Sequence, residues 1–175
     1  MDRKQVRAFE AFVSESGDAL LRTATLLTAD RHAAEDVYQE TLQRLFMRWS
    51  RVDNPGAFSR KVMHNLVIDG FRARKRRPRE LELLDNHDGQ DLRSGDRASA
   101  AEVRPTLLAA LSTLTAQQRA IVVLRYFEDL SQDDVAEILN VSPGTVKSVA
   151  SRAVGLLRAQ PGLMALFADA TVTTS

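Results

Sequence analysis

The sequence predicts an all-α fold of two small helical domains joined by a flexible acidic linker. Apolar residues recur every three or four positions over two stretches, from about residue 4 to 77 and from about 106 to 158, which is the spacing of amphipathic helices. The segment between them is polar, is rich in Asp and Glu and contains Gly89 and Gly95, as expected of a tether. No alternating apolar run is long enough to form a sheet.

These changes in pattern divide the chain into four parts. We expect a first domain at residues 1–78, the linker at 79–104, a second domain at 105–160 and a C-terminal tail at 161–175. The tail follows Pro161 and Gly162 and carries a few apolar residues. Three alternatives remain for it: a short amphipathic turn packed on the second domain, a disordered end, or a regulatory segment.

Composition narrows the class of protein. The chain has 175 residues, of which 44% are hydrophobic, and its net charge is +1, so nucleic-acid binding would depend on local clusters of cations. It contains no cysteine, which excludes disulfides, thiolate zinc sites and cysteine nucleophiles. It has neither the apolar core of a signal peptide nor a run of about 20 apolar residues that would span a membrane. We therefore expect a cytoplasmic protein without membrane contact.

Three helices are predicted in the first domain. The first begins near Phe9 and continues past Gly17 to Leu27, before a break at Thr28-Ala29-Asp30. The second covers residues 30–52 and has a core-facing stripe, formed by Ala34, Val37 or Tyr38, Thr41 or Leu42, Leu45 and Trp49. After a turn at Asn54-Pro55-Gly56, the third runs from Ala57 to Arg76, with inward positions at Phe58, Val62, Leu66 and Phe71.

The end of the third predicted helix is strongly basic. Six cations fall within eight positions: Arg72, Arg74, Lys75, Arg76, Arg77 and Arg79. Capping a helix C-terminus needs one or two cations, so this density favours a polyanionic partner whose phosphates the cations would contact. Asn65 and Asp69 lie one helical turn apart just upstream, on the same side as Arg72, and are candidates for base contacts. A nuclear targeting signal and a role in solubility are the alternatives.

The second domain ends in two predicted short helices separated by a tight turn, residues 130–158. Ser131 is typical of an N-cap, Asn140 of a left-handed helix end, and Ser142 with Pro143 of a second helix start. The second helix has inward positions at Val146, Val149, Ala150, Ala153, Leu156 and Leu157, and outward ones at Thr145, Lys147, Ser148, Ser151 and Arg152. This pattern predicts a helix-turn-helix whose second helix enters a major groove of DNA. The alternative is an ordinary helical hairpin with a solvated polar face.

No pattern in the chain indicates catalysis or metal binding. His32, His64 and His87 lie in separate segments, without an i,i+4 pair or an HExxH motif. The sequence also lacks a glycine-rich phosphate loop and a plausible pair of nucleophile and base. We expect a protein that is not an enzyme and binds no metal and no cofactor.

Three motifs follow one another along the chain. They are AEDVYQETL followed by RW, then NPGAF followed by HNLVIDGFRARKRR, then LSTLTAQQRAIVVLRYFEDLSQDDVAEILNVSPGTVKSVASRA. In this combination the sequence resembles the extracytoplasmic-function (ECF) sigma factors of bacterial RNA polymerase, over roughly residues 5–160. The TVKS recognition helix and the short NPGAF loop are most similar to the actinobacterial SigE-like group.

The resemblance implies a role for the first domain as sigma region two. In this family that domain docks on the clamp helices of the polymerase β′ subunit, and the matching positions are Asp36, Gln39 and Glu40. It also melts the minus-ten element of the promoter, with base capture by the segment from Arg51 to Phe58 and by Asn65 and Asp69. Backbone phosphates would be held by Arg72, Arg74, Lys75, Arg76 and Arg77.

The second domain corresponds in the resemblance to sigma region four. Its second helix would contact the minus-thirty-five element through Ser142, Thr145, Lys147, Ser148, Ser151 and Arg152. Apolar residues near Leu124, Phe127 and Leu130 would form a docking surface for the polymerase β flap. The implied partners are thus core RNA polymerase and promoter DNA, with an anti-sigma protein as a further possible partner.

Two other functions are compatible with the same residues. The first is a stand-alone helix-turn-helix regulator that does not act through core polymerase and dimerises through its first domain. The basic run at 72–79 lies far from the helix-turn-helix and favours a second DNA contact over this alternative. The second is an interaction protein that occupies polymerase without starting transcription.

Overall fold

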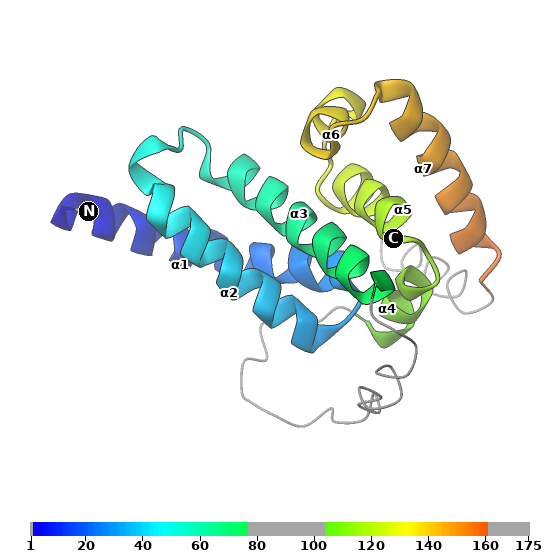
Figure 1. The fold of residues 1–175 in the computed structure, drawn as a ribbon, viewed down its shortest axis with the longest axis horizontal. Helices are drawn as coiled ribbons and strands as arrows, with labels where there is room; N and C mark the ends of the chain where they lie inside the picture. The colour runs from blue at the N-terminus through cyan, green and yellow to red at the C-terminus, as the bar shows by residue number, and fades with distance from the viewer. Residues whose placement is uncertain (1, 77–103, 161–175) are drawn as a thin grey trace, which may run out of the picture.

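The computed structural model describes residues 2–76 and 104–160, with the side chains of 71–76 left out (Figure 1). Every regular element in these ranges is helical, which confirms the all-α prediction. The first half contains α1 (Arg3–Thr28), α2 (Arg31–Arg48), the short 3₁₀ helix η1 (Trp49–Arg51) and α3 (Pro55–Arg76). Arg77, His87, the tail and nearly all of the predicted linker lie outside the described residues.

The second half is built from shorter helices. It contains α4 (Pro105–Ser112), α5 (Ala116–Val122), the π-helical turn η2 (Val123–Phe127), α6 (Gln132–Leu139) and α7 (Pro143–Arg158). In η2 the chain widens, and the amide of Glu128 donates to the carbonyl of Val123, five residues back, at 3.0 Å. No described helix is both long enough and apolar enough to cross a lipid bilayer.

Side-chain caps explain where the helices of the first half begin. Asp2 and Gln5 form a capping box, in which the Gln5 amide donates to Asp2 Oδ1 at 2.8 Å and the Asp2 amide donates to Gln5 Oε1 at 3.2 Å. The predicted break at Thr28-Ala29-Asp30 is confirmed, because Ala29 is left-handed with φ 54° and Asp30 caps α2. The helix α1 passes through Gly17 without interruption, and a Cβ there would lie 2.9 Å from the hydroxyl of Tyr38.

The predicted apolar stripe of α2 is confirmed as the face that packs on α1 and α3. Ala34, Thr41 and Leu45 are fully buried, and Trp49 makes an edge contact with Phe9 at 5.3 Å between ring centroids. From α3, the core receives Val62, Met63 and Val67. The three long helices therefore form one packed unit, with α2 and α3 lying side by side in Figure 1.

The two halves of the chain pack against each other. One continuous hydrophobic cluster contains residues of α1 and α3 together with residues of α4, α5, α6 and α7. Helix α5 contacts both α1 and α3, and α6 also contacts α3 (Figure 1). Helix α7 packs on α5 and α6, so these two helices separate it from α3. Local periodicity did not predict this association between the halves.

The predicted helix-turn-helix is confirmed. Ser131 accepts from the Asp134 amide at 3.1 Å, Asn140 is left-handed with φ 53° and ψ 51°, and Ser142 accepts from the Thr145 amide at 3.1 Å. The inward face of α7 is buried as expected at Val146, Val149, Ala150, Ala153 and Leu157. Leu156 was predicted wrongly, because it is 49% exposed. It lies in the last turn of α7, at the edge of the buried stripe.

The left-handed conformation of Asn140 leads to a stability prediction. Asn140→Ala should lower the free energy of unfolding by about 1 kcal/mol or more, because a Cβ without a compensating polar group disfavours this conformation. Asn140→Gly is the matched control and should leave stability unchanged or slightly raised. Urea unfolding followed by circular dichroism measures both, and equal midpoints for the two variants would contradict this account of the turn.

Candidate nucleic-acid interface

The outward face of α7 is polar and accessible. Lys147, Ser148, Ser151 and Arg152 are all exposed, because the opposite face of the helix carries the buried stripe. Within the described part of the chain, Lys147 has no hydrogen bond or ion pair. Arg152 Nε donates to the Ser148 carbonyl at 3.4 Å, which leaves its terminal nitrogens available for an external acceptor. Two adjacent turns of α7 thus present cationic and hydroxyl donors to one side.

Two predicted contact residues at the start of α7 already have partners in the fold. Ser142 Oγ accepts from the backbone amide of Thr145 at 3.1 Å and lies 2.8 Å from Thr145 Oγ1. Thr145 is half-buried, whereas Ser142 is exposed. Their hydroxyls therefore stabilise the start of the helix, and Lys147, Ser151 and Arg152 are the stronger candidates for DNA contact.

A second polar stripe runs along α3. Asn65 and Asp69 are both exposed, and Lys61 is exposed one helical turn before Asn65. Sequence reasoning missed Lys61, although its i,i+4 spacing to Asn65 was a usable signal. The positions from Arg72 to Arg76 follow in the last turns of α3. Their place on the helix is described, whereas their side chains are not.

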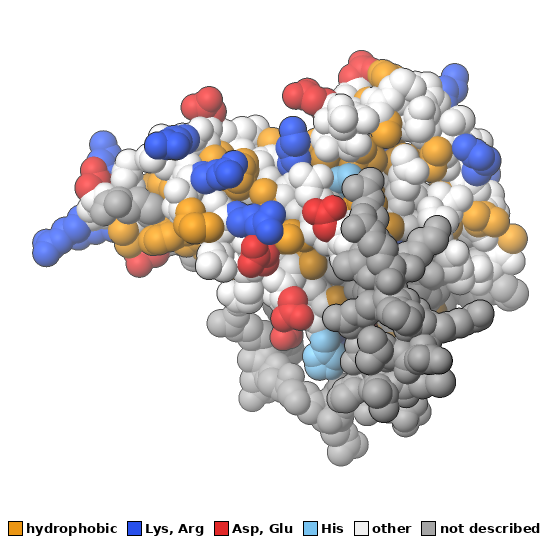
Figure 2. Space-filling view, viewed as in Figure 1, with side chains coloured by type: hydrophobic (Ala, Val, Ile, Leu, Met, Phe, Trp, Pro, Cys, Tyr) orange, Lys and Arg blue, Asp and Glu red, His pale blue; other side chains and the backbone are white. Residues whose placement is uncertain are grey.

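A third surface is a groove of about 1000 Å³ between α1 and α2, with Leu66 of α3 also in its lining. Asp36, Gln39 and Glu40, the three predicted polymerase-contact positions, all line this groove. Its apolar lining includes Phe9, Val13, Val37, Leu42 and Phe46. Figure 2 shows acidic side chains over α2 and hydrophobic ones near its end, where Phe46 is 43% and Met47 68% exposed. Glu40 also pairs with Arg44 at 2.8 Å.

The apolar docking surface for the polymerase β flap, expected near Leu124, Phe127 and Leu130, is only partly present. Leu124 is fully buried in the shared core, so it cannot contact a partner, and Leu130 is half-buried. Tyr126 and Phe127 are exposed by 56% and 44%. Residues 119–124 are all buried, so this part of the chain is covered on every side and Leu124 has no outward face.

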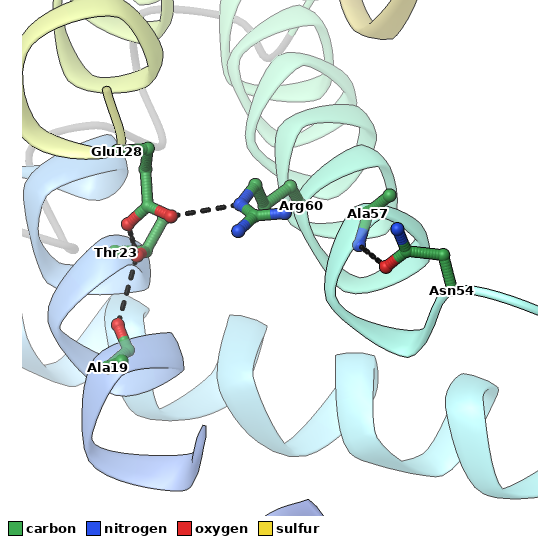
Figure 3. Close-up of polar contacts among 6 residues, drawn as sticks. All are labelled: Ala19, Thr23, Asn54, Ala57, Arg60 and Glu128. Carbon is green, nitrogen blue, oxygen red and sulfur yellow. Dashed lines mark hydrogen bonds and ion pairs between the residues drawn. The ribbon is translucent and has the colours of Figure 1, made fainter. Parts of the chain in front are cut away.

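Sequence reasoning also missed the polar residues between the two halves. Glu128 follows η2 and lies between α1 and α3, where Arg60 Nε donates to its Oε2 at 2.9 Å and Thr23 Oγ1 donates to its Oε1 (Figure 3). Arg119 of α5 is 3% exposed and donates to the carbonyl of Thr28 at 2.6 Å. Arg119 lies three and four positions before Val122 and Val123, on the same face of the helix. A cation on an apolar face indicates that it has buried hydrogen-bond acceptors.

Among the described residues, no cluster of three or more His, Asp or Glu side chains is arranged to hold a metal ion. His32 is exposed at the start of α2. His64 is buried in α3, with its Nδ1 3.4 Å from Asn65 Oδ1.

Family models match both halves of the chain. Residues 12–77 match sigma-70 region 2, and residues 105–157 match sigma-70, region 4. The RNA polymerase sigma-E factor of Streptomyces antibioticus is 36% identical over 161 residues, which are 90% of this chain and 87% of that protein. The ECF RNA polymerase sigma factor SigL of Mycobacterium tuberculosis is 32% identical over 152 residues, 85% of each chain.

Solved structures share the fold. The sigma factor RpoE from Bartonella quintana, crystallised with the anti-sigma factor NepR, has a TM-score of 0.68 and 24% sequence identity. The match covers 87% of this chain and 95% of that one. CnrH, solved with the cytosolic domain of CnrY, gives a TM-score of 0.59 at 24% identity and covers 87% of this chain and 86% of its own. The chain belongs to the ECF sigma factors, the alternative sigma factors that direct transcription initiation by RNA polymerase.

Proposed function

We propose that this protein binds core RNA polymerase through the groove between α1 and α2 and holds promoter DNA through α3 and α7. The observation that carries the proposal is the presence of three separate accessible polar surfaces on one chain that matches both sigma regions. A stand-alone regulator would need only the helix-turn-helix. Catalysis then belongs to the polymerase, and the protein works in the cytoplasm where polymerase is found.

The groove has the chemistry of a docking site for a basic amphipathic helix. Its apolar side chains would cover one face of such a helix, and the carboxylates of Glu10, Asp36 and Glu40 in the same lining would attract flanking cations. The clamp helices of the β′ subunit are the occupant that we propose. Asp36 and Gln39 are exposed, so polymerase can reach both without any rearrangement of α2.

The promoter would be held at two places. Lys147, Ser151 and Arg152 of α7 are proposed to contact the minus-thirty-five element in the major groove. Asn65 and Asp69 are proposed to contact bases of the minus-ten element, with Lys61 as an added phosphate contact on the same stripe. The basic positions from Arg72 to Arg77 would then hold the backbone and make the affinity salt-dependent.

An anti-sigma protein is a further proposed partner. Both structural neighbours were solved with a second protein bound, and in both the shared fold extends over both halves of this chain. A partner that binds both halves at once would keep the protein from polymerase.

The decisive test of the proposed function is a reconstituted transcription assay. The purified full chain should copurify with core RNA polymerase and should yield run-off transcripts from a subset of promoters drawn from genomic DNA. A stand-alone regulator would instead shift duplex promoter DNA without polymerase. Stable binding to core enzyme without transcripts from any promoter would contradict the initiation role and indicate a protein that only occupies polymerase.

The face of α7 predicts an element-specific loss of affinity. Lys147→Ala or Arg152→Ala should weaken holoenzyme binding to promoter DNA by about 1–3 kcal/mol, and most strongly on the preferred upstream sequence. Arg22→Ala is the control, because Arg22 is exposed on α1 in the other half of the chain. Fluorescence anisotropy with matched and scrambled upstream elements measures the difference. An equal loss on both DNAs would show that these residues position the helix and do not specify bases.

The groove predicts a loss of polymerase binding on charge reversal. Asp36→Arg or Glu40→Arg should weaken association with core polymerase at least tenfold, because the new cation repels a basic partner and Asp36 is exposed at the rim. Glu15→Arg makes the same charge change at an exposed position of α1 outside the groove lining and should bind like the parent. Unchanged association of both groove variants would remove the groove from the docking surface.

A further inference from the structure

His64 is the buried neighbour of a proposed DNA-contact residue. It lies in α3 and is 8% exposed, whereas Asn65, the next residue, is exposed on the polar stripe between Lys61 and Asp69. His64 Nδ1 lies 3.4 Å from Asn65 Oδ1. The contact therefore joins a side chain in the packed part of the helix surface to one that faces solvent.

The chemistry of the two atoms decides which of them donates. An amide oxygen can only accept a hydrogen bond, so the proton of this contact belongs to His64 Nδ1. A neutral imidazole carries one ring proton, and the hydrogen bonds of the ring select the nitrogen that holds it. Asn65 Oδ1 therefore favours the form of His64 that is protonated at Nδ1.

The same contact orients the Asn65 amide. The two ends of an Asn side chain differ, because the oxygen accepts hydrogen bonds and the nitrogen donates two. An amide without a partner can turn about its last torsion angle and present either end. With Oδ1 held by His64, Nδ2 is the end that can meet a base, and it can pair only with an acceptor atom of that base.

The burial of His64 makes this orientation effective. A closely packed side chain keeps its rotamer, so His64 Nδ1 stays in one place. A group that is held in position before binding also loses less conformational entropy when its partner arrives. Lys61, one turn earlier on the stripe, needs no such support, because a lysine ammonium donates in three directions and acts on phosphates as a point charge.

We propose that His64 is a positioning residue for base selection, which holds the Asn65 amide so that Nδ2 donates to an acceptor atom of one base in the minus-ten element. This inference rests on the proposed function, which assigns a base contact to Asn65 and no part to His64. His64 itself does not touch DNA, because it is buried. It determines which base is preferred and leaves the charge of the stripe unchanged.

The orientation can be measured in the full chain without polymerase or DNA. Long-range proton–nitrogen correlation spectra of isotope-labelled protein should show His64 in the Nδ1–H tautomer at a pH where the ring is neutral. The Asn65 side-chain amide should have restricted motion in the parent and greater motion in His64→Leu, which lacks the donor. An Nε2–H tautomer in the parent, or an Asn65 amide that is equally mobile in both proteins, would overturn the proposal.

Base preference tests the consequence for promoter binding. Holoenzyme is titrated with single-stranded minus-ten oligonucleotides that carry each of the four bases at each position. His64→Leu should lower the preference at one position about three- to tenfold, the range expected for loss of one hydrogen bond. The affinity for the least favoured base at that position should change little, because the phosphate contacts are retained.

Two further variants of α3 control for a general effect of altering a buried side chain. His64→Asn should keep the base preference, because its amide N–H can replace the Nδ1 donor. Ser59→Ala should also keep it, since Ser59 is buried and its Oγ has no hydrogen-bond partner among the described residues. Loss of preference in either variant, with helicity retained by circular dichroism, would show that His64 acts only through packing.

A double substitution separates this inference from the proposed function. With Asn65→Ala present, His64 has no amide to orient, so adding His64→Leu should cause no further loss of base preference. If Asn65→Ala loses the preference and His64→Leu keeps it, or if the two losses add, the role of His64 is wrong and the proposed base contact stands. If Asn65→Ala binds every oligonucleotide as the parent does, the proposed base contact of Asn65 fails, and the role of His64 in base selection fails with it.

Discussion

The arrangement of the whole molecule depends on how the C-terminal end of α1 is satisfied. The last carbonyls of α1 face the second half of the chain. The guanidinium of Arg119 donates to the carbonyl of Thr28, and the Arg119 side chain is almost completely buried. Burying a cation is costly unless several acceptors surround it. Carbonyls from α1 and from the loop before α5 supply them together. The same contact therefore fixes the end of α1, the α4–α5 loop and the angle between the halves.

The surfaces proposed for partners lie away from this interdomain contact. The groove between α1 and α2, the stripe on α3 and the outward face of α7 all remain accessible while the halves are packed. The packing of the two halves thus leaves each surface accessible. A partner that binds the groove first would meet a preformed site.

Local physical rules predicted the helices and the helix-turn-helix well, because caps and periodicity are properties of neighbouring residues. Ser131, Asn140 and Ser142 adopt the capping roles expected from their side chains. The errors at Leu156 and Leu124 arose where exposure depends on how far other helices cover a position. The interdomain contacts join residues about 70 to 105 positions apart, a separation that no periodic pattern encodes. The contact residues proposed for DNA and polymerase stay predictions.

The contact that Glu128 makes with α1 and α3 depends on the number of residues in the π-helical turn η2. The hydrogen bond from the Glu128 amide to the Val123 carbonyl closes a ring with one residue more than an ordinary helical turn. The direction in which the Glu128 side chain points therefore depends on that additional residue. Loss of a single position here would rotate it by about 100° around the helix axis, away from its donors Thr23 of α1 and Arg60 of α3. A deletion of one residue in η2 would thus break the contact between the halves while every side chain that now makes it is retained.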